Sequence, residues 1–404
     1  MGHLRIALIF IFIIVGHQAM ANTSQTWYRL LRNYGLNKVQ QAYCFRHPNG
    51  TIHGRNINKK INPASVTKLY VTFFALKKLG AHHQYKTTFH YKNGHLHIEG
   101  GQDNYFTTDS LNFILGELNK MGVNQVERLT FDSQFYFNWT RPYMGLAWLL
   151  KSYVNTYDWN QIQRMEFSNL ESQLGELQLN IPLPPSIDFS ADKVYIKNNA
   201  KLSSFDFKIE YLSSPLSFHL KQMNIYSNNF IGWNLFNDLG GEQVFKKFMF
   251  EEFSVDHKIF RIENGAGFSP NKTTCRLTLY LMEELERQVA VEGIKITDII
   301  SVPGEDHGTL SERFQDEYKK TLVAKTGTLK KTSSLAGLLN TDGRRFPFAI
   351  FNHTSQHWAA IKVQDYMVKK IFNEVGPYKA YRYQYSDYIS LLKTETKIDS
   401  FFDL

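Results

Sequence analysis

A serine and a lysine three positions apart, Ser65 and Lys68, are side chains that can form and activate a nucleophile. They open an apolar segment that predicts a helix to about Leu79, with Gly80 as its C-cap. Residues i and i+3 of a helix share a face, so the lysine amine can lie beside the serine oxygen. Pro63, just before them, suits the first turn of a helix. An amine held in this way can activate a serine without a histidine.

Two further motifs follow in order along the chain. Ser227 and Asn229 supply a second hydroxyl and a carboxamide, with Asn228 between them. Lys325–Thr328 then supply a cation, two hydroxyls and a glycine on a strand-like run. A Ser-x-x-Lys pair alone is common and usually means only a solvated or capping pair. The three motifs in this order are the signature of penicillin-binding proteins and serine β-lactamases.

Composition sets the class of protein. The chain has 404 residues, 43% hydrophobic and 15% aromatic, which is typical of a globular protein with room for two domains. The formal net charge of +9 comes from scattered lysines and arginines, which makes nucleic acid a poor candidate partner. The 14 histidines show no zinc-peptidase spacing, so neither a metal nor another cofactor is expected. The two cysteines, Cys44 and Cys275, fit a disulfide in an exported protein and fit buried thiols equally well.

Both chain ends bear on localisation. Arg5 precedes the apolar run Ile6–Val15, and small residues follow at Ala19–Ala21. Because this run is short for a membrane span, residues 1–21 are predicted to be a cleaved signal peptide, with an uncleaved N-terminal anchor as the alternative. The protein is therefore expected in the periplasm or another extracytoplasmic space. The tail Ile389–Leu404 fits either an amphipathic helix in peripheral contact with a membrane or a packed terminus.

The remaining patterns predict the elements that position the motifs. Strand signals early and late in the chain surround a helical middle, which indicates an α/β (α+β) fold with an antiparallel sheet flanked by helices. Residues 22–81 and 206–404 are assigned to this catalytic domain, and 82–205 to an inserted accessory domain. The predicted strands of the catalytic domain are Gln41–Arg46, Thr51–Arg55, Lys319–Thr328, Ser333–Asn340 and Arg345–His353, and its last helix is Trp358–Glu374. The predicted elements of the insertion are the hairpin Tyr85–Tyr91 with His95–Glu99, the helix Thr108–Lys120 and the strand Leu129–Phe137.

With the motifs placed, the chain resembles the penicillin-binding protein 4 (DacB-type) D-Ala-D-Ala carboxypeptidase/endopeptidases, which are low-molecular-mass penicillin-binding proteins. Glu263–Ser269 is similar to that family's Asp-Gly-Ser-Gly-Leu-Ser loop. Pro303–Leu310 resembles the segment before its third motif, and Ala324–Leu329 with Leu335–Gly337 matches its strand pair. Gly100–Asp103 stands where the family has a Gly-Asp-Pro segment in its inserted domain. The resemblance implies the transpeptidase fold with an inserted smaller domain.

The resemblance also implies acyl transfer by three catalytic residues. Ser65 would be the nucleophile and Lys68 its general base, which requires a neutral amine. Burial and the positive charge of Lys325 are both expected to lower the pKa of Lys68. Ser227 would pass the proton to the leaving amine.

Five residues are assigned to substrate binding. Asn229 would hold the substrate amide. Lys325, Thr326 and Thr328 would bind the terminal carboxylate of the peptide, and Gly327 would let the substrate lie against the strand edge. The backbone N–H groups of the nucleophile and of Thr328 would form the oxyanion hole.

The expected function is an exported serine D,D-peptidase that cleaves D-Ala-D-Ala termini, D,D-crosslinks or both in peptidoglycan. Its expected partners are peptidoglycan stem peptides, with β-lactams as covalent inhibitors. Two alternatives remain: a β-lactamase or esterase on the same fold, and a catalytically idle cell-wall-binding protein. The second alternative arises because Asn228 replaces the family's usual Asp and Gly232 with Trp233 replaces an Ala-Glu pair.

Overall fold

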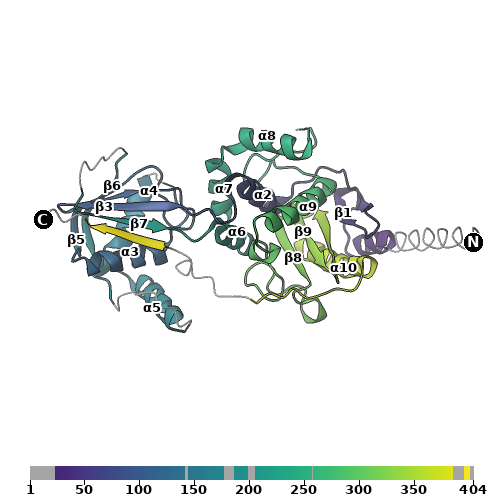
Figure 1. Ribbon diagram of the computed structural model, residues 1–404. Coiled ribbons are helices and arrows are strands. Elements are labelled where there is room, and N and C mark those ends of the chain that lie inside the picture. Colours follow the sequence, from purple (N-terminus) through teal and green to yellow (C-terminus); the bar gives the residue numbers. More distant parts are fainter. Residues whose placement is uncertain are drawn as a thin grey trace, which may run out of the picture. The chain divides into compact units, whose positions relative to one another are not determined.

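The computed structural model describes residues 23–141, 144–176, 186–198, 205–256, 258–384 and 395–400. The chain divides into two compact units, each built from two separate stretches (Figure 1). The described residues of unit 1 fall within 1–80 and 220–386, and those of unit 2 within 81–219 and 387–404. The predicted signal peptide at residues 1–21 lies outside the described residues. No helix within the described ranges is long and apolar enough to cross a membrane.

The boundaries of unit 2 differ from the predicted insertion at residues 82–205. Strand β7 (Phe207–Leu212) pairs with β3 (Lys86–Lys92), which extends unit 2 to residue 219. Strand β11 (Glu395–Ser400) pairs with β7, so this part of the tail also belongs to unit 2. Assigning all of 206–404 to the catalytic domain was therefore wrong for these two strands. Within the tail predicted as an amphipathic helix or a packed terminus, residues 395–400 form a strand.

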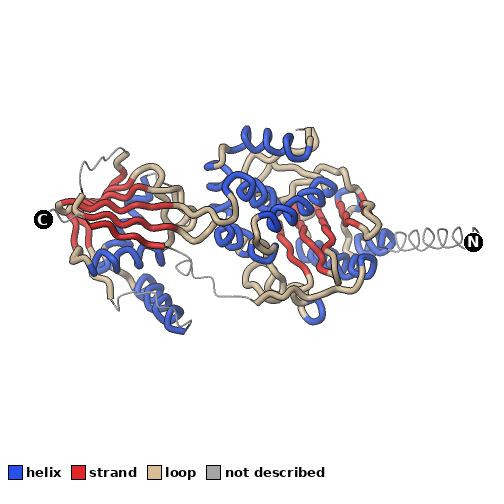
Figure 2. Tube along the Cα trace, in the orientation of Figure 1, coloured by secondary structure: helices blue, strands red, loops and turns tan. Residues whose placement is uncertain are grey.

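The sheet of unit 1 is antiparallel and joins the two ends of the chain. Its strand order is β2-β1-β10-β9-β8, and Figure 1 shows the early strand β1, in purple, beside the late strands in green. Helices flank this sheet (Figure 2), so the predicted α/β architecture is confirmed. The predicted strand ranges differ from the observed ones only at their ends. The strands are β1 (Gln41–Arg46), β2 (Ile52–Arg55), β8 (Leu322–Leu329), β9 (Thr332–Asn340) and β10 (Arg345–Asn352).

Alternation along the strands separates the two faces of this sheet. Phe348 and Ile350 of β10 join a buried cluster with α10 (His357–Val375). The intervening residues point to the opposite face, where α9 (Cys275–Val291) packs on β10 and β1. Because helices cover both of its faces, β10 is buried from Phe346 to Asn352. Strands in such a position are apolar nearly throughout instead of alternating. The other helices of this part of the chain are α2 (Thr67–Leu79), α6 (Leu216–Ile225), α7 (Asn229–Asp238) and α8 (Gly241–Phe253).

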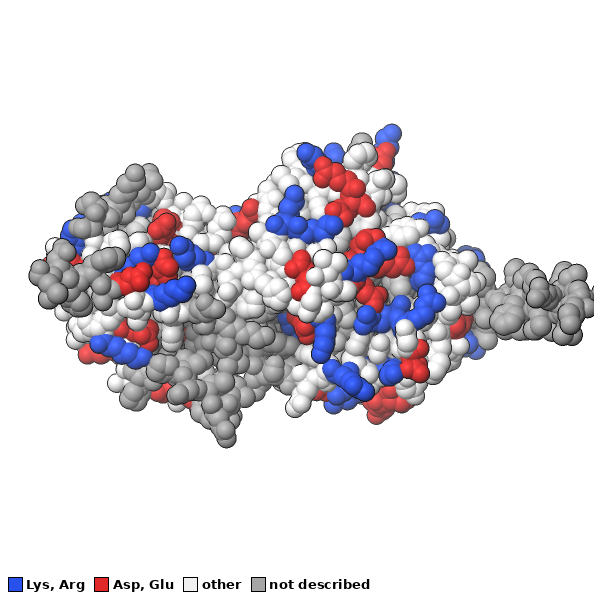
Figure 3. All heavy atoms as spheres, viewed as in Figure 1, with Lys and Arg blue, Asp and Glu red and all other residues white. Residues whose placement is uncertain are grey.

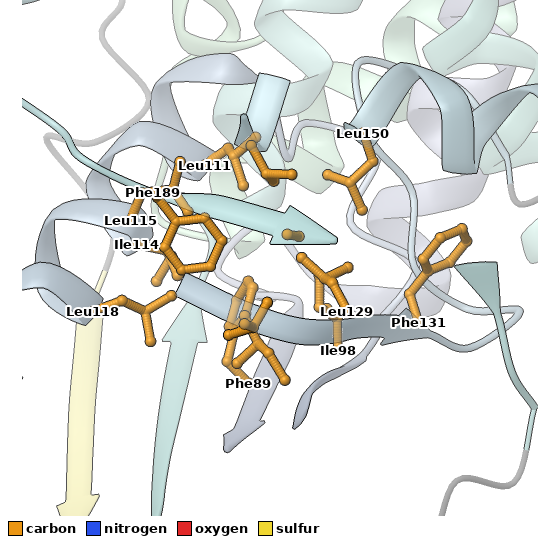
Figure 4. Close-up of a cluster of buried hydrophobic side chains, with 14 of the residues drawn as sticks. Phe89, Ile98, Leu111, Ile114, Leu115, Leu118, Leu129, Phe131, Leu150 and Phe189 are labelled. Atoms are coloured by element: carbon orange, nitrogen blue, oxygen red, sulfur yellow. The ribbon is translucent and has the colours of Figure 1, made fainter. Parts of the chain in front are cut away.

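Unit 2 has a mixed sheet with the strand order β11-β7-β3-β4-β5-β6. β5 is parallel to both β4 and β6, and the other pairs are antiparallel. In Figure 4 the leucine and isoleucine side chains of α3 (Thr108–Lys120) lie in one buried cluster with Phe89 of β3 and Ile98 of β4. The side chains of α3 recur at the helical spacing of an amphipathic face. The elements not yet bounded are β4 (His95–Glu99), β5 (Gln125–Phe131), α4 (Met144–Val154), α5 (Gln161–Glu176) and β6 (Ser190–Ile196).

The predicted strand Leu129–Phe137 is displaced in the structure. β5 ends at Phe131 because Asp132 follows it and forms a turn. One oxygen of the Asp132 carboxylate accepts the backbone N–H groups of Gly100, at 3.0 Å, and of Gln134, at 2.9 Å. A side chain that binds the backbone two residues on offers an alternative to the strand ladder.

A disulfide joins the sheet of unit 1 to α9. Cys44 on β1 bonds to Cys275, the first residue of α9, across a sequence separation of 231 residues. The sequence had left open whether these residues pair, and the structure shows that they do.

Replacing both Cys44 and Cys275 by alanine should lower the melting temperature of the protein. A crosslink over so long a loop restricts the unfolded chain, and losing a native disulfide typically costs about 2–4 kcal/mol. Differential scanning calorimetry with and without a reducing agent measures the effect. Reduced wild type should melt like the double variant, whereas equal melting temperatures for oxidised wild type and the variant would contradict a stabilising bond.

Candidate active site

The nucleophile candidate lies in a tight turn at the start of α2. Ser65 is half-buried in a 3-10 turn (Ala64–Val66), and α2 begins two residues later at Thr67. Ala64 has a φ of +50°, in the left-handed region. That conformation costs roughly 1–2 kcal/mol for a residue with a side chain. The side-chain oxygen of Asn62 accepts the N–H of Ala64 at 2.7 Å, which helps to hold the turn. Strained backbone that is held in this way is common at active sites.

Lys68 occupies the first turn of α2 and is fully buried. Its Nζ atom donates to three oxygens: Ser65 Oγ at 3.1 Å, Asn229 Oδ1 at 2.8 Å and the carbonyl of Ala266 at 3.0 Å. An ammonium group has three N–H bonds, so this site satisfies all of them. Burial lowers the pKa of Lys68 from 10.5 to about 7. The amine is therefore partly neutral near pH 7 while it stays in contact with the serine oxygen, as a general base must be.

The second motif forms the turn between α6 and α7. Ser227 adopts a left-handed conformation with a φ of +56°, and α7 starts at Asn229. This turn directs the Asn229 amide oxygen at the lysine of the first motif, so the structure brings these two residues together. Ser227 is half-buried in the same turn, and its hydroxyl has no hydrogen-bond partner in the described part of the chain.

Asn228 has a structural role at this turn. It is the N-cap of α7, and its side-chain oxygen accepts the N–H groups of Phe230 at 2.9 Å and Ile231 at 3.1 Å. Asparagine and aspartate are equally good in this position. The replacement of the family's Asp by Asn therefore keeps the function that the side chain has here.

The third motif brings a second lysine close enough to Lys68 to be affected by its charge. Lys325 on β8 is fully buried, and its Nζ atom donates to the carbonyl of Thr326 at 3.0 Å. Burial and, second, the positive charge of Lys68 hold the pKa of Lys325 well below its usual value. For Lys68 itself, burial is the cause of the lowered pKa, so the expected contribution of Lys325 is not found there. Repulsion between the two amines favours the state in which only one carries a charge.

Gly327 explains how close the third motif comes to the nucleophile. A Cβ atom on Gly327 would lie 2.9 Å from the backbone nitrogen of Ser65 and 2.5 Å from the carbonyl oxygen of Pro63. Only glycine fits in that space. Ser334 on β9 strengthens the contact, because its hydroxyl donates to the Pro63 carbonyl at 2.6 Å. Thr328, one residue beyond, is exposed.

Thr326 is positioned by a residue to which no role had been assigned. Its hydroxyl donates to the hydroxyl of Thr309 at 2.9 Å. The N–H of Thr309 in turn bonds to the carbonyl of Ile225 at the end of α6, at 3.2 Å. The segment before β8 therefore ties the second motif to the third.

A buried ion pair holds this same segment. Lys221 on α6 lies 2.5 Å from Asp306, and both side chains are almost inaccessible to solvent. The lysine also donates to the carbonyls of Thr297 and Ile300, at 2.7 and 2.8 Å. Desolvation lowers the pKa of Lys221 to about 8 although the carboxylate opposes the shift. Separating the two side chains would leave a buried charge without a partner, which is strongly unfavourable. The pair therefore holds α6 against the segment before β8.

Sequence reasoning assigned no role to the loop at 263–268, which completes the site. Ala266 supplies the carbonyl that accepts from Lys68. A Cβ atom on Gly265 would lie 2.0 Å from the carbonyl oxygen of Gly232 on α7, and one on Gly267 would lie 2.1 Å from that of Ala64. The signal in the sequence was the two glycines that flank Ala266. Gly232 had been noted only as a departure from the family.

No metal site accompanies these groups. Within the described ranges there is no cluster of three or more histidine, cysteine or acidic residues that could hold a metal ion. The catalytic and binding candidates instead form a constellation for acyl transfer: a serine, a buried amine beside it, a carboxamide on that amine and a second lysine on the adjacent strand.

The chain is similar to known proteins in both sequence and structure. A model of the D-Ala-D-Ala carboxypeptidase 3 (S13) family matches residues 47–157 and 190–372, which include all three motifs. No curated protein matches the sequence.

Three solved structures illustrate the likeness in fold. The Bd3459 predatory endopeptidase from Bdellovibrio bacteriovorus, in complex with immunity protein Bd3460, is 23% identical with a TM-score of 0.77, covering 85% of this chain and 95% of that chain. The Bd0816 predatory endopeptidase of the same organism is 26% identical with a TM-score of 0.77, covering 88% and 99%. Penicillin binding protein 4 (dacB) from Haemophilus influenzae is 17% identical with a TM-score of 0.59, covering 86% and 99%. The predicted fold and the predicted family resemblance are both confirmed.

The acylation rate of the protein by a penicillin should rise as the pH increases through about 7. Below that pH Lys68 is protonated and has no lone pair to accept the serine proton. Stopped-flow measurement between pH 5 and 9 gives the profile. Lys68→Arg keeps the side chain charged at every pH and should lose about 100- to 10,000-fold in rate. A wild-type rate that does not vary with pH would contradict Lys68 as the base.

Asn228→Ala should lower the free energy of unfolding by about 1 kcal/mol, because α7 loses the acceptor for its first N–H groups. Asn228→Asp is the matched control and should leave stability and acylation close to wild type. Urea unfolding followed by circular dichroism measures the first quantity. If the aspartate variant were as unstable as the alanine variant, the capping role would be wrong.

Proposed function

The chain belongs to the D-Ala-D-Ala carboxypeptidase 3 (S13) family, and from this membership we propose that it is an exported serine D,D-peptidase of peptidoglycan. Its substrates would be D-Ala-D-Ala termini, D,D-crosslinks between stem peptides, or both. The reaction would proceed through an acyl-enzyme on Ser65.

One observation carries this proposal: the amine of Lys68 is buried and in hydrogen-bond contact with the Ser65 oxygen at 3.1 Å. Burial removes the solvation that would keep an ammonium ion charged. The contacts with Asn229 and Ala266 fix the amine in position, so it needs no rearrangement before the proton transfer.

The first half of the reaction would form the acyl-enzyme. Neutral Lys68 takes the hydroxyl proton of Ser65 as the serine oxygen attacks the substrate carbonyl. The backbone N–H groups of Ser65 and Thr328 stabilise the oxyanion, a type of interaction worth about 3 kcal/mol for each donor. The carbon–nitrogen bond then breaks, and Ser227 passes a proton from Lys68 to the leaving amine.

The second half returns the free enzyme. A water molecule attacks the ester carbonyl and loses its proton to Lys68. The bond to the Ser65 oxygen breaks, and that oxygen takes the proton back. The product is a shortened peptide with a new carboxylate, and no group is left on the protein.

Binding of the substrate would use the remaining candidates. Lys325 and Thr326 lie on the strand next to the nucleophile turn, where they would bind the terminal carboxylate. Asn229 contacts Lys68 through its oxygen, which leaves its N–H₂ group to hold the substrate amide. Gly327 would let the peptide lie close to β8.

Known relatives support both a terminal and a crosslink substrate. Bd3459 is described as a peptidoglycan endopeptidase, and one of its structures is acylated by penicillin G. The matching family is named for carboxypeptidase activity. The proposal therefore keeps carboxypeptidase and endopeptidase activity together.

Export is part of the proposal and rests on the sequence. Residues 1–21 have the pattern of a signal peptide, and peptidoglycan lies outside the cytoplasm. A disulfide between Cys44 and Cys275 supports the same compartment, because such bonds persist in oxidising environments.

The two alternatives differ in what they predict. The altered second motif favours an idle cell-wall-binding protein, but the capping role of Asn228 removes much of that reason. A β-lactamase would turn over a chromogenic cephalosporin rapidly. A D,D-peptidase would form a long-lived adduct with it instead.

Digestion of purified muropeptides tests the proposal. Wild type should release D-alanine or separate crosslinked dimers, and Ser65→Ala should lose at least about 10,000-fold in rate because the nucleophile is absent. The matched control is Ser152→Ala on α4, where the hydroxyl only bonds within its own helix. Mass spectrometry of the products identifies the bond that is cut.

Labelling with a fluorescent penicillin provides the second measurement. Wild type and Ser152→Ala should carry one label per chain, and Ser65→Ala none. Folded wild type that forms no adduct and cuts no muropeptide would overturn the proposed function.

A further inference from the structure

A pocket of about 640 Å³ opens beside the candidate active site. One wall is Lys59–Asn62, the segment that leads directly into the nucleophile turn. A second wall is Leu329–Thr332, the turn that follows the third motif, and a third is formed by Ser269, Asn271 and Lys272. The volume is that of a small-molecule or peptide site.

The walls of this pocket are cationic. Five lysines and a histidine line it, and the lining residues include no aspartate or glutamate. Among the described residues no acidic side chain forms an ion pair with any of the five. Over the face of the molecule drawn in Figure 3, by contrast, acidic and basic side chains are interspersed. These six residues, called the lysine pocket below, are Lys59, Lys60, Lys272, Lys330, Lys331 and His353.

Like charges held together without counterions raise the positive potential in a concave site and attract anions. The lysine pocket therefore favours an anionic ligand. The location of the pocket indicates that the anion belongs to the substrate. The pocket lies at the end of β8, the strand along which the substrate peptide would bind. β8 is the last strand in the order of its sheet, and among the described residues nothing pairs with its outer edge beyond Ala324, so that edge can receive an extended peptide.

Two fixed points give the direction of such a peptide. Under the proposed function its terminal carboxylate lies at Lys325, and the carbonyl to be attacked lies at Ser65, next to Gly327. The peptide therefore runs antiparallel to β8. Its residues before the scissile bond pass Thr328 and reach the turn at Lys330. A strand advances about 3.3 Å per residue, so this turn lies about 10 Å beyond Gly327.

We propose that the lysine pocket binds free carboxylates of the substrate peptide two or three residues before the scissile bond. This inference rests on the proposed function, because the orientation of the peptide follows from it. It assigns a specificity site: the peptidase prefers acidic stem peptides over those in which the same carboxylates are amidated. Lysine, a compact point charge on a flexible stem, suits carboxylates presented in more than one geometry.

A matched pair of peptides tests the preference. One is acetyl-γ-D-Glu-L-Lys-D-Ala-D-Ala, and the other carries an amide in place of the free glutamate carboxylate. Wild type should hydrolyse the carboxylate peptide with a kcat/KM roughly three- to tenfold higher, the size expected for two partly exposed ion pairs. The difference should shrink between 20 and 300 mM salt, because exposed charges are screened.

Lys330→Gln/Lys331→Gln removes two of the five lysine charges, at an exposed turn, and should reduce the preference through a lower kcat/KM for the carboxylate peptide. The control Lys246→Gln/Lys247→Gln removes the same charge from the exposed face of α8 and should keep the preference. Equal loss with both peptides, or no loss with either, would overturn the proposal. The proposal would also be overturned if added polyphosphate removed the preference of the wild type while Lys330→Gln/Lys331→Gln left that preference unchanged.

Binding separates this proposal from the proposed function. Ser65→Ala cannot form the acyl-enzyme, so calorimetric titration with each peptide measures affinity alone. A tighter Kd for the carboxylate peptide that depends on Lys330 and Lys331 supports the lysine pocket even if wild type cleaves neither peptide. In that case the proposed function fails and the binding site stands. Equal Kd values for both peptides overturn the inference even if hydrolysis is fast.

Discussion

The structure of the site depends on a single constraint, the burial of the Lys68 amine among three oxygens. An isolated ammonium ion is costly to bury, so each of its N–H groups needs an acceptor. The three acceptors come from the nucleophile turn, the start of α7 and the loop at 263–268. These segments must therefore approach the same point. Glycines at 232, 265 and 267 let their backbones come that close, and burial gives the amine its lowered pKa.

The parts of the site are held from outside by polar contacts that take no part in the chemistry. Lys221 and Asp306 fix α6 to the segment before β8, and Thr309 connects that segment to Thr326. Ser334 ties β9 to the residue before the nucleophile turn. Positions are thus set by interactions between segments far apart in the chain. A site assembled in this way is rigid, which suits catalysis by preorganised groups.

Sequence alone placed Ser65, Lys68 and Asn229 in one candidate site, because acyl transfer demands particular groups in a particular order, and the structure brings these three side chains into contact. Their catalytic and binding roles stay predictions. Sequence also predicted the sheet of unit 1, whose strands alternate or are apolar throughout. It did not predict the Ala266 carbonyl or the contact of Gly232 with Gly265. Backbone groups carry no side-chain signature, and their positions follow from packing. The end of β5 was misplaced because the turn at Asp132 outweighed the strand propensity that continues to Phe137. The boundary at 205 was wrong because only pairing in the sheet assigns β7 to unit 2.

In both sheets, strands from distant parts of the chain are neighbours, and this affects when each sheet can form. β1 is an inner strand of its sheet, and its neighbour β10 lies about 300 residues later in the chain. In unit 2, β7 receives its outer partner only from residues 395–400. During synthesis, neither sheet can be completed until nearly the whole chain exists. Contacts of such long range form slowly. The sheet of unit 1 therefore stays open during translation, with one edge of β1 unpaired until β10 has been synthesised.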